Sequence, residues 1–115
     1  MTAADPYDKA HELAQAIMNS DIYRNYLNAK EDVEKNLEIM RKILVLREHQ
    51  MEINRAQVMG QSLPENKLRD VAIEHAQLCK EPGVADFFEA ERAFIKLYND
   101  LMEIIHESVG RALQD

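Results

Sequence analysis

A glutamate and a histidine three residues apart, near the C-terminal end of the chain, are the residues best placed to do chemistry. Glu103 and His106 form a Glu-x-x-His pair, and this spacing on a helix puts both side chains on one face. Such a pair is half of the ligand set of a ferritin-like di-iron bundle, which needs a second pair and two further glutamates. No second Glu-x-x-His pair occurs in the chain. A metal- or small-ligand-binding helical bundle is therefore kept only as an alternative to a solvated pair near a helix C-terminus.

The other histidines do not complete a catalytic motif. His11 begins a His-Glu pair like that of a zinc-protease helix, but the residue four positions later is Gln15. His49 and His75 lie in polar surroundings and are predicted to be exposed or to face a partner. The chain contains no glycine-rich phosphate loop and no Gly-x-Ser-x-Gly elbow. The sequence therefore predicts a protein that is not an enzyme and has no cofactor.

Composition limits the class of protein further. The chain has 115 residues, a formal net charge of −7 and one cysteine, Cys79, which we expect to be a small buried residue on a helix. A single cysteine cannot form an internal disulfide, and no apolar run approaches the roughly 20 residues of a membrane-spanning helix. The segment Met1 to Pro6 has no signal-peptide character. These features favour one cytoplasmic domain over residues 1–115 that does not insert into a membrane.

One stretch has a mild excess of basic residues. Arg41, Lys42, Arg47 and Arg55 occur within a few helical turns of each other. We expect them to pair mainly with nearby glutamates and with the acidic C-terminal part of the chain. Two alternatives stay open, namely docking of an acidic protein partner and direct binding of nucleic acid. The net negative charge disfavours nucleic acid, because phosphate binding depends on clustered Lys and Arg.

Helix start and stop signals divide the chain into about five helices. Asp5 before Pro6, Ser20 and Asn36 are N-cap candidates, Ser62 with Glu65 fits a capping box, and Gly60 marks a helix end. The expected helices cover residues of about 6–19, 21–31, 36–59, 63–80 and 83–113. With few glycines and prolines in their interiors, these segments predict an all-α fold, an elongated bundle with two long helices.

Each of the two long helices carries two apolar stripes. In the first, a series at intervals of seven contains Leu37, Leu44, Met51 and Val58, and a second stripe contains Ile39, Ile43, Leu46 and Ile53. In the second, the series is Phe88, Ile95, Met102 and Val109, and the second stripe is Phe94, Tyr98, Leu101 and Ile105. The two stripes of a helix lie about 100° apart, so each helix has one face for its own chain and one face to spare. The spare faces predict a homodimer, parallel or antiparallel.

A family resemblance follows from the order and spacing of residues along nearly the whole chain, from about Tyr7 to Val109. The N-terminal part carries Tyr7, Asp8, Ala10, Leu13, Ala14, Ile17, Ser20, Tyr23, Tyr26 and Ala29-Lys30, and the long helix ends in Met59-Gly60. Further on come Glu81-Pro82-Gly83-Val84, then Phe88, Glu89, Ala90 and Glu91, then Leu97, Asp100, Ile104 and Ile105. In these features the chain resembles the YlbF/YmcA/YheA group of small bacterial proteins, also called the control-of-competence family.

The resemblance implies an all-helical fold, frequent dimerisation and a bacterial cytoplasmic setting. Some members act with sister proteins as accessory factors for the endoribonuclease that matures messenger RNA, and thereby affect competence, biofilm formation and sporulation. Certain members supply cysteines for iron–sulfur clusters, whereas this chain has Cys79 alone. The leading hypothesis is therefore a regulatory adaptor that dimerises and binds protein partners, which by resemblance include sister family members and an RNA-processing endoribonuclease.

Overall fold

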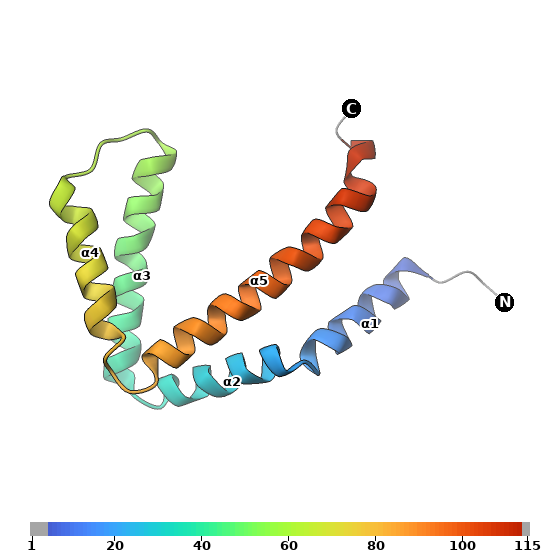
Figure 1. Ribbon diagram of the computed structural model, residues 1–115, viewed down its shortest axis with the longest axis horizontal. Coiled ribbons are helices and arrows are strands. Elements are labelled where there is room, and N and C mark those ends of the chain that lie inside the picture. The colour runs from blue at the N-terminus through green and yellow to red at the C-terminus, as the bar shows by residue number, and fades with distance from the viewer. Residues whose placement is uncertain (1–4, 114–115) are drawn as a thin grey trace. The chain divides into compact units, whose positions relative to one another are not determined.

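The computed structural model describes residues 5–113, and these residues are helical almost throughout. Residues 1–4, which belong to the segment considered for signal-peptide character, and residues 114–115 lie outside the described part. The helices are α1 (Pro6–Met18), α2 (Asp21–Glu34), α3 (Leu37–Val58), α4 (Glu65–Leu78) and α5 (Val84–Val109), followed by the 3₁₀ turn η1 (Gly110–Leu113) (Figure 1). No strand occurs in residues 5–113, so the predicted all-α class is confirmed.

Side chains cap several helices where the sequence predicts it. Asp5 accepts a hydrogen bond from the backbone N–H of Tyr7 at 2.9 Å. The Ser20 hydroxyl accepts one from Tyr23 at 3.2 Å, and the Asn36 side chain accepts from the first residues of α3. Each cap satisfies an amide that has no partner within the helix. These three predicted helix starts are confirmed.

The predicted capping box before α4 is wrong. Pro64 occupies the N-cap position with extended backbone, and no side chain makes a capping hydrogen bond there. The boundaries also differ in detail, because α2 continues to Glu34 and α5 gives way to η1 after Val109. Gly60 marks a turn as expected, and Gly83 marks another. Gly60 and Gly83 have φ of 70° and 80°, a left-handed conformation that other residues adopt only at a cost.

The chain consists of two compact units. The hairpin unit is Ala29–Phe87, which contains the end of α2, all of α3 and α4, and the first turn of α5. The paired-helix unit combines Met1–Asn28 with Phe88–Asp115, so that it contains α1, the start of α2 and most of α5. Each unit has its own packing.

All of the buried apolar side chains in the described residues belong to the hairpin unit. They are Val33, Ile39, Ile43, Leu46, Ala56, Val71, Leu78, Val84 and Phe87. Ile39, Ile43 and Leu46 lie on one face of α3. Val71 and Leu78 belong to α4, which packs against α3. At about 25 cal/mol per Å² of apolar surface removed from water, this cluster is the main source of stability of the unit.

The paired-helix unit has no fully buried apolar side chain in its described residues. Its packing centres on the ring of Phe94 in α5, which stacks on Tyr26 at 5.2 Å between ring centroids and meets Tyr23 edge-on at 5.4 Å. Leu97 and Leu101 continue the half-buried row along α5. The unit consists only of α1, the start of α2 and most of α5, so its apolar side chains are only partly covered.

Candidate functional site

The two apolar stripes of α3 differ sharply in exposure. Ile39, Ile43 and Leu46 are 5%, 1% and 1% exposed, and Ile53 is half-buried. The series at intervals of seven, which we call the α3 outward face, is 57–79% exposed and consists of Leu37, Leu44, Met51 and Val58. Of the residues predicted for a dimer or core seam, Ile43 and Leu46 are thus in the core of the hairpin unit. Leu37, Leu44 and Met51 point to solvent.

In α5 the inward row is different from the predicted stripe. Phe94 and Leu101 lie in it, but Tyr98 and Ile105 are 54% and 44% exposed, and Leu97 takes the inward place between them. The helix packs with the 94, 97 and 101 positions inward, a three-then-four spacing that also follows one helical face. Exposed apolar residues therefore form a second surface. This α5 outward face consists of Ile95, Tyr98, Met102, Ile105 and Val109.

The four predicted docking residues do not form one patch. Lys42 Nζ donates a hydrogen bond to Glu81 Oε1 at 2.9 Å, and this hydrogen bond and the charge of Glu81 raise the pKa of Lys42. The Arg47 guanidinium lies 5.5 Å above the centre of the Phe87 ring, a cation–π arrangement. Arg41 and Arg55 are exposed. Two of the four cations are therefore engaged within the hairpin unit, and two are directed outward.

Polar links join α3 to α4, and sequence reasoning missed them. His49 Nδ1 lies 2.7 Å from Glu74 Oε1, and Lys67 Nζ lies 3.0 Å from Glu52 Oε2. Both pairs are only partly exposed, and each joins residues on different helices. These pairs are hard to predict from the sequence alone, because their partners become neighbours only when α3 and α4 pack antiparallel.

Glu52 should titrate below its ordinary pKa of 4.5, because the hydrogen bond from Lys67 and its positive charge lower the pKa of that carboxyl. A lowered folded-state pKa stabilises the fold above pH 4.5, and this contribution is lost as the pH falls through the lowered value. An NMR titration of the carboxyl carbon should show a midpoint that Lys67→Met moves back toward 4.5. Lys9→Met, which removes the partner of Glu12 instead, is the control. A Glu52 midpoint that is the same in both variants would contradict the assignment.

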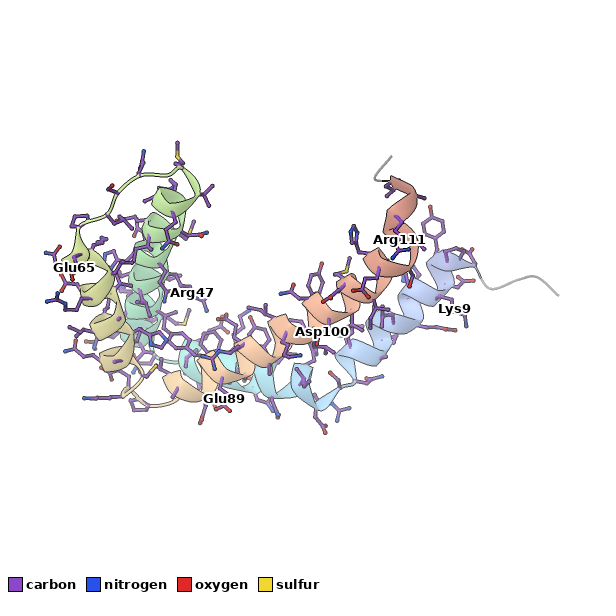
Figure 2. The ribbon with its side chains drawn as sticks, turned by 45° about the horizontal axis from the view of Figure 1, so that its top comes forward. Lys9, Arg47, Glu65, Glu89, Asp100 and Arg111 are labelled. Carbon is purple, nitrogen blue, oxygen red and sulfur yellow. The ribbon has the colours of Figure 1, made fainter. Side chains whose placement is uncertain are left out.

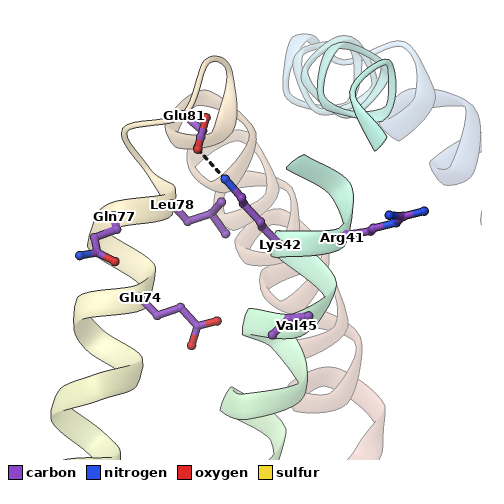
Figure 3. Close-up of a pocket in the computed structure, with 7 residues that line it drawn as sticks. All are labelled: Arg41, Lys42, Val45, Glu74, Gln77, Leu78 and Glu81. Carbon is purple, nitrogen blue, oxygen red and sulfur yellow. Dashed lines mark hydrogen bonds and ion pairs between the residues drawn. The ribbon is translucent and has the colours of Figure 1, made fainter. Parts of the chain in front are cut away.

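A cavity of about 440 Å³ opens between α3 and α4. It is lined by Arg41, Lys42, Val45, Glu74, Gln77, Leu78 and Glu81 (Figure 3). Leu78 and Val45 give it an apolar floor, and the Lys42–Glu81 pair lies at one end, while the guanidinium of Arg41 points away from it. Its two carboxylates already face basic partners, Glu81 facing Lys42 and Glu74 facing His49. Both carboxylates in the cavity wall therefore already have a side-chain partner within the hairpin unit.

The candidate metal pair lies on exposed surface. Glu103 and His106 are both exposed on α5, and the His106 ring lies against Gly110, where an added Cβ would come within 2.5 Å of its Nδ1. Cys79 is half-buried and lies 3.9 Å from His75 Nδ1, so the expected buried position is not observed. Within residues 5–113, no three His, Cys, Asp or Glu side chains are grouped closely enough to hold a metal ion. Glu103 and His106 therefore have no third ligand among the described residues.

None of the helices in residues 5–113 combines the length and apolar character needed to cross a bilayer. The fold and its surfaces define a small all-α protein with two exposed apolar faces. Residues 7–110 match the family described as "Control of competence regulator ComK, YlbF/YmcA". The chain therefore belongs to the YlbF/YmcA control-of-competence family, as the resemblance predicted.

Relatives from three bacteria extend the similarity to nearly full length. A UPF0342 protein of Desulfitobacterium hafniense is 29% identical over 103 residues, which cover 90% of this chain and 83% of the relative. A UPF0342 protein of Staphylococcus epidermidis is 27% identical over 113 residues, 98% of this chain and 99% of the relative. A UPF0342 protein of Caldicellulosiruptor saccharolyticus is 24% identical over 103 residues, which cover 90% of this chain and 86% of the relative.

Proposed function

We propose that this protein is a non-enzymatic regulatory adaptor that forms a homodimer and binds protein partners in the bacterial cytoplasm. The observation that carries the proposal is the pair of exposed apolar faces, one on α3 and one on α5. Monomeric soluble proteins rarely leave contiguous apolar patches uncovered, and such patches mark interaction sites. The half-buried core of the paired-helix unit also supports dimerisation, because a second chain would cover more of its apolar surface.

The family suggests the process in which the adaptor acts. A family described as controlling a competence regulator is consistent with a role exerted through other proteins. We propose that the partners include sister members of the family and an RNA-processing endoribonuclease, with effects on competence, biofilm formation and sporulation. Direct binding of nucleic acid is disfavoured by the net charge of −7 and by the engagement of Lys42 and Arg47 within the chain.

Two measurements test the proposal. Sedimentation equilibrium at micromolar concentration should give twice the 13.3 kDa mass of one chain. Co-purification from the native host after mild cross-linking should recover a specific set of proteins, and a variant with Leu44→Glu and Met102→Glu should lose them. A monomer at all concentrations would contradict dimerisation. Recovery of the same proteins with the variant would contradict binding through these faces.

A further inference from the structure

Helix α5 has apolar residues on two sides, and the paired-helix unit covers only one of them. On the covered side Phe94 packs on Tyr23 and Tyr26 of α2. On the other side, the five residues of the α5 outward face are 44–63% exposed. A helix that is apolar on two sides is normally covered on both of them. The described part of this unit therefore lacks a second layer of helices over α5.

The exposed apolar surface is large enough for a dimer contact. The five side chains are each about half exposed, and together they present on the order of 500 Å², as much as the largest apolar patches of monomeric proteins. Two copies that cover these residues would bury on the order of 1,000 Å², the area at which a specific interface becomes stable. Polar side chains at the border of the contact would add to this area.

The residues of the α5 outward face are spaced almost symmetrically about Met102. Ile95 and Val109 lie seven residues before and after it, and Tyr98 and Ile105 lie four before and three after. In an antiparallel contact with a two-fold axis at Met102, Ile95 lies opposite Val109 of the second copy. Tyr98 then lies opposite Ile105 of the second copy. Such a self-complementary contact covers all five residues in both chains at once.

Charge does not oppose this contact. The charged side chains within residues 95–109 are Lys96, Asp100, Glu103 and Glu107. At about 100° per residue, these four positions lie on the side of α5 away from the outward face. Lys96 Nζ also pairs with Asp100 Oδ2 at 2.8 Å, and Asp100 is labelled in Figure 2. Two α5 outward faces can therefore meet without bringing like charges together.

The α3 outward face is less suited to an antiparallel contact with its own copy. Arg41, Glu48 and Arg55 follow one another beside it at intervals of seven. An antiparallel contact over the whole α3 outward face would place Glu48 near Glu48 of the second copy, and Arg41 near its Arg55. Like charges opposite each other at an interface disfavour association. Charged residues beside the apolar stripe instead suit a different protein with complementary charges.

We propose that the homodimer forms through the α5 outward face, which packs antiparallel against the α5 outward face of a second copy with Met102 at the two-fold axis. The helix pairs of the two chains then form one bundle, with a core between the two α5 helices. This inference rests on the proposed dimerisation and adds which surface joins the copies. It leaves the α3 outward face of each chain for other protein partners.

Cysteine cross-linking tests both the contact and its direction. In full-length chains that carry Cys79→Ser, Met102→Cys should give a disulfide-linked dimer under mild oxidation, because the two introduced thiols meet at the axis. Ile95→Cys alone should not link, since its two copies would lie about 21 Å apart along the helices at 1.5 Å per residue. A mixture of Ile95→Cys and Val109→Cys chains should link one chain of each kind. Ile104→Cys is the control, because Ile104 is 60% exposed on another side of α5.

The dissociation constant of the dimer gives a second measurement. Met102→Glu places two carboxylates beside each other at the axis, so the dissociation constant should rise by about 30-fold or more, as for hot-spot changes at other interfaces. Ile104→Glu on α5 and Leu44→Glu on α3 also replace exposed apolar side chains, and both should leave the dissociation constant unchanged. Analytical ultracentrifugation measures this constant, and circular dichroism checks that each variant keeps its helices.

Three outcomes would overturn the proposed contact while leaving the dimer itself intact. Dimerisation that Met102→Glu does not weaken would exclude the α5 outward face. Loss of the dimer in Leu44→Glu would indicate contact through α3 instead. Disulfide linkage of Ile95→Cys to its own copy would show a parallel arrangement. A wild-type chain that is monomeric at all concentrations would overturn both this contact and the proposed dimerisation.

Discussion

Replacing Ile43 with alanine is expected to lower the free energy of unfolding by about 2–5 kcal/mol, the range observed for large-to-small changes in well-packed cores. Ile43 is 1% exposed and lies on the inward face of α3 between Ile39 and Leu46. Loss of its side chain removes apolar burial and leaves a cavity that the two helices of the hairpin cannot fully close. Urea unfolding followed by far-UV circular dichroism, at one fixed chain concentration, measures the effect.

Ile73→Ala is the matched control, since Ile73 is also an isoleucine within a helix but is 47% exposed. We expect a change of less than about 1 kcal/mol, because alanine has the higher helix propensity and little burial is lost. Equal losses for the two variants would contradict the assignment of Ile43 to the core.

Replacing Phe94 with alanine is expected to cost about 2–4 kcal/mol, and the loss should appear in the paired-helix unit. Two aromatic pairs depend on this ring, each worth about 0.5–1.5 kcal/mol beyond the area that it buries. Its partners Tyr23 and Tyr26 lie on α2, so the ring joins α5 to that helix. Hydrogen exchange should become faster in α2 residues 21–28 and slow exchange should persist in α3.

Phe94→Leu separates the two sources of stability in this cluster. Leucine keeps much of the apolar burial but makes no ring contact, so its loss should be smaller than that of alanine by about 1–2 kcal/mol. If leucine and alanine were equally destabilising, the ring contacts rather than burial would account for the whole effect. An unchanged exchange rate in α2 with either variant would contradict the role of Phe94.

The apolar periodicity of α3 shows both the strength and the limit of sequence reasoning. Two stripes were evident from the spacing of Leu37, Leu44 and Met51 and of Ile39, Ile43 and Leu46. Because both stripes are made of similar aliphatic residues, burial of either would gain comparable free energy from the hydrophobic effect. Only the packing of α4 against α3 shows that the second stripe is the inward one.

A similar ambiguity explains the error in α5. Tyr98 and Ile105 fit a four-then-three spacing with Phe94 and Leu101, and Leu97 fits a three-then-four spacing with the same two residues. The two choices differ by a modest rotation of the helix about its axis. The structure decides the rotation, because Leu97 is half-buried whereas Tyr98 and Ile105 are exposed, and this difference is not visible in a one-dimensional pattern.

By itself, the sequence determined the starts of the first three helices, because the side chains of Asp5, Ser20 and Asn36 act on amides only two or three residues away. It also determined the family, since similarity over residues 7–110 depends on order and spacing alone. Only the tertiary structure decided which stripes are inward and which side chains pair, as for Lys42 with Glu81, which are 39 residues apart. The reason is physical: caps and turns depend on local backbone geometry, whereas burial and long-range pairing depend on which helices pack together.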